Sequence, residues 1–271
     1  MKKILTFFLV IGLSLSLLAG CSQSGNDKKI VVGATPTPHG EILEVAKEVL
    51  AEKGYELEIK EFAEYVQLNP TLNNGELDAN YFQHKPYLDN YNQENNAKLV
   101  SIAAIHYEPL GLYPGKTTSI EELQDGAQIA VPNDTTNEAR ALLLLETLGL
   151  IKVDPDAGLE ATINDIVENP KNLKIVEIEA AQLARSLPDV EMAVINGNYA
   201  IQAGLNAASD ALAKEEQDSL AAETYANIVA VREEDKNSEK LLALVDALKS
   251  DKVREFIAEK YQGSVVVVGQ P

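Results

Sequence analysis

The pattern of apolar and polar positions predicts two α/β units of similar layout. In the first, KKIVVGAT (28–35) is a short β-branched run, EILEVAKEVLAEKG (41–54) has apolar residues at helical spacing, and YELEIKEF (55–62) alternates as a strand does. A second series starts at QIAVPND (128–134), continues as a helix over TNEARALLLLETLGL (136–150) and reaches another predicted strand. Strand, helix and strand in this order open an α/β sheet, so we expect two lobes of the same fold class.

Two further segments predict how the lobes are joined. LVSIAAIHYEPLGLYP (99–114) is extended, since Pro109 and Pro114 make it a poor helix, and YANIVAVRE (225–233) resembles it. The region that follows (238–261) has the pattern of two helices. We therefore expect the chain to leave the first lobe, build the second and return, with a hinge and a ligand cleft between the lobes. The predicted lobes are residues 29–108 with 228–271, and residues 109–227.

The N-terminus differs from the rest of the chain. Two lysines precede an apolar run over residues 4–18, and the sequence Leu-Ala-Gly-Cys follows, ending at Cys21. This is typical of a secretory signal peptide, predicted here as residues 1–20, and the run is too short for a stable membrane span. Leu-Ala-Gly-Cys resembles a bacterial lipobox, in which the cysteine is lipidated. We expect residues 21–28 to be a lipidated N-terminus and tether that anchors the protein on the extracytoplasmic face of the cell membrane.

Composition excludes several classes of function. Forty-two acidic and 23 basic residues give a net charge of -19, which argues against nucleic acid binding. The hydrophobic fraction of 45% supports a sizeable core, and with Cys21 as the one cysteine no internal disulfide can form. The chain has no G-x-S-x-G, P-loop or G-x-G-x-x-G motif, and its three histidines lack metal-ligand spacing. We expect no enzymatic activity, cofactor or bound metal.

The decapeptide ANYFQHKPYL (79–88) contains the first candidate binding residues. Phe82 and His84 would point to the same side of a strand, because side chains alternate. Two rings at the end of a strand form a wall for a flat or polarisable apolar group, and Tyr65 could add a third ring. Packing in the core is the alternative, and for Phe82 taken alone it is favoured.

Polar candidates come from the second lobe. Arg140 lies in the first turns of a predicted helix, where the positive end of the helix dipole disfavours a cation unless an anion is bound there. Arginine also suits bidentate capture of a carboxylate, although pairing with Glu138 or solvation remains an alternative. Asn196 and Asn198 close the apolar run MAVI, where asparagine suits a rim that hydrogen-bonds a ligand; an Asn-Gly turn is the other interpretation.

Several longer segments together resemble the NlpA/MetQ lipoprotein family. They include FAEYVQLN, GELDANYFQHKPYLDNY, IH-x-EPLGLY, DIVENPKNLKIVEIEAAQLARSL and AVINGNYA, and the match runs from about residue 30 to the C-terminus. The resemblance implies a two-lobed periplasmic-binding-protein fold of type II. It also implies a methionine-binding component of a bacterial ABC importer, with a permease and its ATPase as partners. Two alternatives stay open: a methionine-containing dipeptide or other small amino acid as ligand, and a surface adhesin without a transport role.

The resemblance also implies roles for individual residues. Family aromatics surround the methionine side chain, an arginine binds the carboxylate, and an asparagine contacts the polar end of the ligand. Tyr107 departs from the family pattern, because an aliphatic residue is common at its position. The matching residues here are Tyr65, Phe82 and His84 for the side chain, Arg140 for the carboxylate, Asn196 and its neighbour Asn198 for the polar end, and the departing Tyr107.

Overall fold

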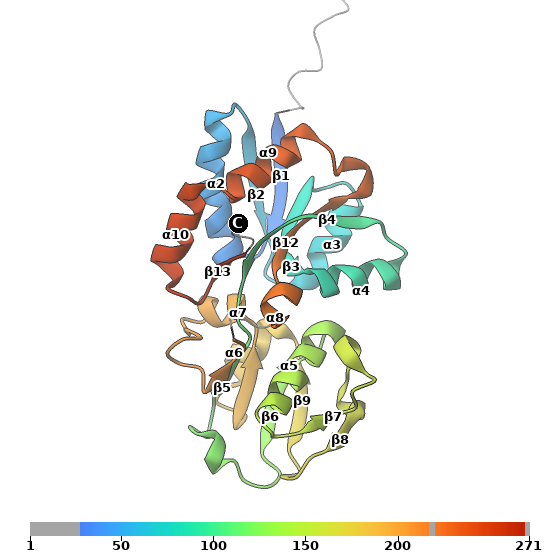
Figure 1. Cartoon of the computed structure of the whole chain (residues 1–271), viewed down its shortest axis with the longest axis vertical. Coiled ribbons are helices and arrows are strands. Elements are labelled where there is room, and N and C mark those ends of the chain that lie inside the picture. The colour runs from blue at the N-terminus through green and yellow to red at the C-terminus, as the bar shows by residue number, and fades with distance from the viewer. Residues whose placement is uncertain (1–27, 217–219, 269–271) are drawn as a thin grey trace, which may run out of the picture.

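The protein has two lobes, each built around its own β-sheet (Figure 1). The computed structural model describes residues 28–216 and 220–268, so the predicted signal peptide and the predicted lipidation site at Cys21 lie outside the described residues. Both ends of the described chain form the first lobe, at the top of Figure 1, and the middle of the chain forms the second. No helix within residues 28–216 and 220–268 is long and apolar enough to cross a membrane.

The first lobe is a six-stranded mixed sheet with helices on both faces. Its elements are β1 (Lys29–Ala34), α2 (Glu41–Glu52), β2 (Glu56–Glu61), α3 (Leu68–Asn73), β3 (Ala79–His84), α4 (Lys85–Asn95), β4 (Leu99–Tyr107), β12 (Asn227–Arg232), α9 (Glu239–Leu248), α10 (Asp251–Tyr261) and β13 (Val266–Val267). The strand order is β13-β4-β12-β3-β1-β2, with β1 parallel to β2 and β3, and β12 antiparallel to β3 and β4. One apolar cluster joins the sheet to α2, α9 and α10, and another joins it to α3 and α4. Helices on both faces explain why β1 reads as a continuous apolar run.

The second lobe has a five-stranded sheet. Its elements are β5 (Gly111–Pro114), β6 (Gln128–Pro132), α5 (Thr135–Thr147), β9 (Lys174–Ile178), α6 (Leu183–Ser186), β10 (Met192–Ile195), α7 (Gly197–Gln202) and β11 (Ala213–Lys214), with a separate β7 (Lys152–Val153) and β8 (Ile166–Glu168) pair. The strand order is β11-β5-β10-β6-β9, with β6 parallel to both β9 and β10. The predicted helix over 136–150 is α5, which Asp134 caps by accepting from the backbone N–H of Asn137 at 3.1 Å.

The chain crosses between the sheets twice. It leaves the first sheet at the end of β4 and enters the second at the start of β5, and it returns through α8 (Leu220–Thr224) into β12. The two-lobed α/β architecture predicted from the duplicated pattern is therefore confirmed. The predicted lobe limit 108/109 falls at the first crossing, and the limit 227/228 falls after the first residue of β12; we propose them as the boundaries.

Candidate functional site between the two lobes

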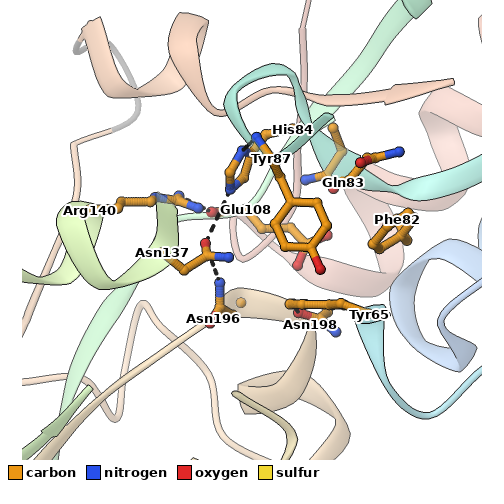
Figure 2. A pocket seen from close by; sticks show the side chains of 12 residues that line it. Tyr65, Phe82, Gln83, His84, Tyr87, Glu108, Asn137, Arg140, Asn196 and Asn198 are labelled. Carbon is orange, nitrogen blue, oxygen red and sulfur yellow. Dashed lines mark hydrogen bonds between the residues drawn. The ribbon is translucent and has the colours of Figure 1, made fainter. Parts of the chain in front are cut away.

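A pocket lies where the two lobes meet, and we refer to it as the cavity (Figure 2). Side chains from the first lobe, from the second lobe and from both crossings contribute to its wall. The cleft predicted from the two crossings is thus present in the structure. The lining residues are Tyr65, Phe82, Gln83, His84, Tyr87, Glu108, Asn137, Arg140, Asn196, Gly197, Asn198 and Asn227.

Aromatic rings from the first lobe form one wall of the cavity. The ring centroid of Phe82 lies 5.6 Å from that of Tyr65 and 5.8 Å from that of Tyr87. Tyr65 also lies 4.9 Å from Tyr199 of the second lobe, so the wall reaches across the cleft. Rings at these distances present an apolar, polarisable surface to whatever fills the cavity. Phe82 and His84 both line it, and so does Gln83 between them.

His84 ends β3 and begins α4. Its Nδ1 accepts the backbone N–H of Tyr87 at 3.2 Å, so its Nε2 carries the proton and donates to Asn137 Oδ1 at 3.1 Å. Burial, and then the positive charge of Arg140, lower the pKa of His84 to about 3. His84 is therefore a neutral donor at neutral pH. Lys85, the next residue, is exposed and pairs with Asp89 at 2.6 Å, away from the cavity.

Three asparagines of the second lobe form the opposite, polar wall. Asn196 Nδ2 donates to Asn137 Oδ1 at 2.8 Å, and the hydroxyl of Tyr65 donates to Asn198 Oδ1 across the cleft. Two buried atoms of this wall have no hydrogen-bond partner among the described residues: Asn196 Oδ1, an acceptor, and Asn198 Nδ2, a donor. Buried polar atoms are normally paired. The wall therefore suits a ligand that can both donate and accept a hydrogen bond.

Arg140 reaches the cavity from the first turns of α5, but its main partner is within the protein. Nε donates to Glu215 Oε1 at 2.8 Å and Nη2 to Glu215 Oε2 at 2.5 Å, while Nη2 also donates to the backbone carbonyl of Glu108 at 3.0 Å. Burial opposes the charge of Arg140, yet Glu215 more than compensates and raises its pKa. Glu138, the alternative partner, accepts instead from the backbone N–H of Ile163 at 2.9 Å.

Tyr107 is the one predicted binding residue that does not line the cavity. Its side chain is fully buried, and its hydroxyl donates to Glu215 Oε2 at 2.7 Å. The backbone N–H of Leu110 donates to the same oxygen at 2.9 Å. Burial would raise the pKa of Glu215, but Arg140 reverses this and the pKa is lowered. Tyr107 and the backbone of Leu110 thus hold Glu215 in position to pair with Arg140.

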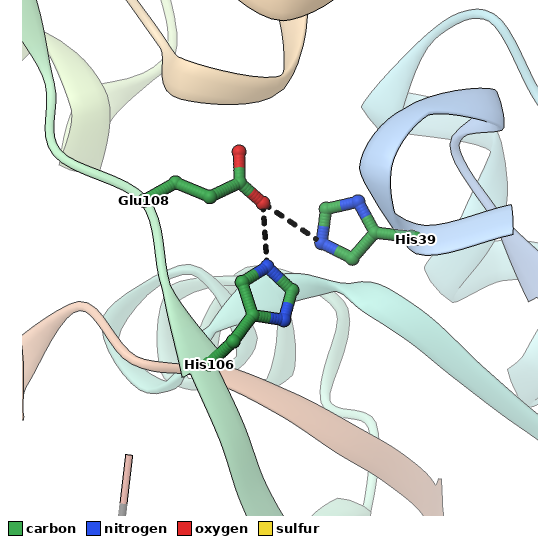
Figure 3. Close-up of side chains that lie close together, drawn as sticks. All are labelled: His39, His106 and Glu108. Carbon is green, nitrogen blue, oxygen red and sulfur yellow. Dashed lines mark hydrogen bonds and ion pairs between the residues drawn. The ribbon is translucent and has the colours of Figure 1, made fainter. Parts of the chain in front are cut away.

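A third carboxylate, Glu108, lies with two histidines at the first crossing (Figure 3). Its Oε1 is 2.7 Å from His106 Nε2 and 3.3 Å from His39 Nε2. All three residues are buried. Burial lowers the pKa of His39 to about 4 and that of His106 to about 3, and it raises the pKa of Glu108.

The ligand atoms of these three residues lie within 4.8 Å of one another, which is close enough to hold a metal ion. Hydrogen bonds within the protein already occupy all four ring nitrogens. Thr35 Oγ1 lies 2.7 Å from His39 Nδ1 and the Tyr81 hydroxyl bonds His106 Nδ1, while His39 Nε2 bonds Asn227 Oδ1 at 3.0 Å and His106 Nε2 bonds Glu108 Oε1 at 2.7 Å. The prediction that the protein binds no metal stays a prediction.

Sequence reasoning missed six of the lining residues. Tyr87 lies inside the quoted decapeptide, and Asn137 lies one helical turn before Arg140, so position could have indicated both. The sequence did not indicate Glu108 as a binding residue, because His39 is distant along the chain and Tyr107 separates His106 from Glu108. The remaining three are Gln83, Gly197 and Asn227.

Comparisons with known proteins agree with this geometry. The model of the NlpA lipoprotein family matches residues 30–268. The D-methionine-binding lipoprotein MetQ of Salmonella typhimurium is 45% identical over 97% of this chain and 98% of its own length. The methionine-binding lipoprotein MetQ of Bacillus subtilis is 40% identical, with 100% of each chain covered. These names describe binding proteins, not enzymes.

A solved structure gives the same result. The nutrient binding protein of Burkholderia cenocepacia bound to methionine is 45% identical and superposes with a TM-score of 0.85, covering 89% of this chain and 100% of that one. The resemblance stated from sequence segments is therefore confirmed over nearly the whole length. The chain belongs to the NlpA lipoprotein family.

Proposed function

We propose that the protein is a lipid-anchored substrate-binding protein on the extracytoplasmic face of the membrane. It captures methionine, as the L or D enantiomer, between its lobes and delivers it to an ABC permease driven by an ATPase. It has no enzymatic role of its own. The observation that carries this proposal is a buried inter-lobe cavity with aromatic rings on one wall and unpaired amide groups on the other. The names of the relatives support the choice of ligand.

The aromatic wall suits the methionine side chain. A thioether beside aromatic rings gains about 0.3–1.5 kcal/mol, and burying the side chain contributes about 1.5–3 kcal/mol. We assign this contact to Tyr65, Phe82 and Tyr87. These gains fall short of the roughly 8–12 kcal/mol of micromolar to nanomolar binding, so the polar wall has to supply the rest.

The polar wall suits the charged end of an amino acid. We assign the ligand carboxylate to Asn198 Nδ2 and to Nη1 of Arg140, because Nε and Nη2 of Arg140 already donate within the protein. Hydrogen bonds to charged groups contribute about 1.5–3 kcal/mol each. We assign the ligand amine to Asn196 Oδ1, while His84 orients Asn137 and through it Asn196. Glu215 and Tyr107 hold Arg140 in place.

Mass spectrometry of the ligand released from the purified protein by unfolding tests this proposal. We expect methionine, and a melting temperature that rises with methionine after the ligand has been removed. Release of a methionine-containing dipeptide would keep the receptor and change its ligand. A melting temperature that no amino acid or dipeptide raises would favour a surface protein without a transport role.

A further inference from the structure

The charges around the cavity do not balance. Glu108 and Arg140 are the charged residues among those that line it. Arg140 is already paired with Glu215, whose two oxygens it contacts at 2.8 and 2.5 Å. In the ion pairs of the described chain, Glu108 meets histidines alone. If those histidines are neutral, Glu108 has no cation of its own: burial raises its pKa, and the charge of Arg140 and the backbone N–H of Asn198 lower it by less.

The hydrogen-bond pattern keeps both histidines neutral. The hydroxyl groups of Thr35 and Tyr81 bond the Nδ1 atoms of His39 and His106. Each Nε2 then carries the proton. That of His106 donates to Glu108 Oε1 at 2.7 Å, whereas that of His39 donates to Asn227 Oδ1 at 3.0 Å and has Glu108 Oε1 at 3.3 Å, so a neutral imidazole satisfies these contacts. Burial also lowers the pKa of both rings, to about 4 and about 3. Glu108 therefore receives a hydrogen bond from His106 but no positive charge from either ring.

The second oxygen of Glu108 points away from the histidines. Both contacts end on Oε1, and Figure 3 shows the other oxygen directed to the opposite side. Oε2 lies beside the start of α7, where a Cβ at Gly197 would come within 3.0 Å of it and within 2.6 Å of Glu108 Cβ. Glycine at this position lets the carboxylate approach the start of α7, where the backbone N–H of Asn198 lowers its pKa; Asn196, two residues earlier, has an Oδ1 that is buried without a partner. Two acceptors, one of them charged, thus stand on the cavity wall.

We propose that Glu108, held by His39 and His106, binds the ammonium group of the ligand and makes the site selective for a free amine beside a carboxylate. This inference rests on the proposed function and names a specificity-determining residue for it. A buried carboxylate without a cation is costly, and a ligand ammonium removes that cost. A carboxylic acid without the amine would instead place a second negative charge near Glu108.

Two probes and two variants test the role of Glu108. Calorimetry on the unlipidated chain, freed of bound ligand, compares L-methionine with 4-(methylthio)butanoate, which differs in lacking the amine. We expect Glu108→Gln to weaken methionine binding by about tenfold to a hundredfold and to change 4-(methylthio)butanoate binding by about threefold or less. Glu64→Gln removes one negative charge near Tyr199 without touching the cavity, and we expect both affinities to stay within about twofold.

Equal weakening of both ligands by Glu108→Gln would overturn the inference and leave the proposed function intact. So would a wild-type protein that binds the two ligands equally, or methionine binding that a metal chelator abolishes. Failure of the wild type to bind methionine would instead remove the proposed function and the inference with it. If Glu108→Gln does not fold, Gly197→Ala replaces it, because its methyl group displaces Glu108, and we expect the same fall in the ratio of the two affinities.

Discussion

Glu215 and Glu108 are two buried carboxylates near Arg140, and they differ in their partners and in the direction in which their pKa values shift. Glu215 accepts from the guanidinium of Arg140, from the hydroxyl of Tyr107 and from a backbone N–H, and its pKa is lowered. Glu108 has two histidines as partners, and burial raises its pKa. A carboxylate with a permanent cation is structural, because its charge is already balanced. A carboxylate without one is available to a charged ligand.

Arg140→Ala should break this comparison most severely. It leaves Glu215 buried without a cation, and we expect a loss of about 3–5 kcal/mol in the free energy of unfolding, together with most of the affinity for any amino acid. Chemical denaturation and calorimetry measure the two effects. Arg185→Ala, an exposed arginine of the same lobe, is the matched control and should change neither. Normal binding by Arg140→Ala would refute the carboxylate assignment.

Phe82→Ala changes the aromatic wall of the cavity, where neither carboxylate lies. It therefore separates contacts with the ligand side chain from the effects of the two carboxylates. We expect affinity for methionine to fall by about tenfold to a hundredfold while affinity for alanine changes little, because the loss is in contacts with the ligand side chain. Competition calorimetry with the two amino acids gives the ratio. Phe256→Ala, on the far side of the first lobe in α10, controls for the loss of a ring. An unchanged ratio would place the methionine side chain elsewhere.

Glu215→Gln separates a structural carboxylate from a ligand-binding one. It keeps the shape and part of the hydrogen bonding, so we expect a loss of about 1–3 kcal/mol in stability. The ratio of affinities for methionine and 4-(methylthio)butanoate should stay unchanged, in contrast to Glu108→Gln. Urea denaturation and calorimetry on the two variants side by side make the measurement. If both variants shifted this ratio equally, the two carboxylates would not have different roles.

The smallest expected effect is on the pH dependence of stability. The lowered pKa of Glu215 means that its stabilisation is present above the carboxyl pKa of the unfolded chain, 4.5, and is lost as the pH falls through the folded value. The raised pKa of Glu108 has the opposite sign, since it costs stability at neutral pH and that cost disappears as the pH falls toward 4.5. Acidification from pH 7 should therefore narrow the stability gap between wild type and Glu215→Gln. Acidification should raise the stability of the wild type relative to Glu108→Gln, which is the opposite direction. Denaturation at each pH measures both differences in the free energy of unfolding.

Local sequence patterns predicted the fold and one wall of the site. The strand pattern was enough to bring Phe82 and His84 to the cavity, although Gln83 between them lines it too. A duplicated strand–helix order was enough for two lobes, because such patterns depend on neighbours along the chain. The strand in ANYFQHKPYL nevertheless ends at His84, where the side chain caps the next helix and Pro86 fits its first turn.

Long-range pairs could not be predicted in this way. Glu215 is one acid in an acidic stretch, and nothing near it indicates that Arg140 lies opposite. His39 and Glu108 likewise meet because two lobes and a crossing come together, which no periodicity encodes. The sequence therefore indicated Arg140 as a ligand residue without revealing that its guanidinium is largely engaged by Glu215.

Calorimetric titration of the wild-type chain, freed of bound ligand, with methionine is the most direct test of the central claim. The account predicts saturable binding of L- or D-methionine at a single site, with an affinity in the micromolar range or tighter, and much weaker binding of alanine. It also predicts weak binding of 4-(methylthio)butanoate, which lacks the positive group for Glu108. Absence of heat with both enantiomers, under conditions where the protein is folded, would contradict the account.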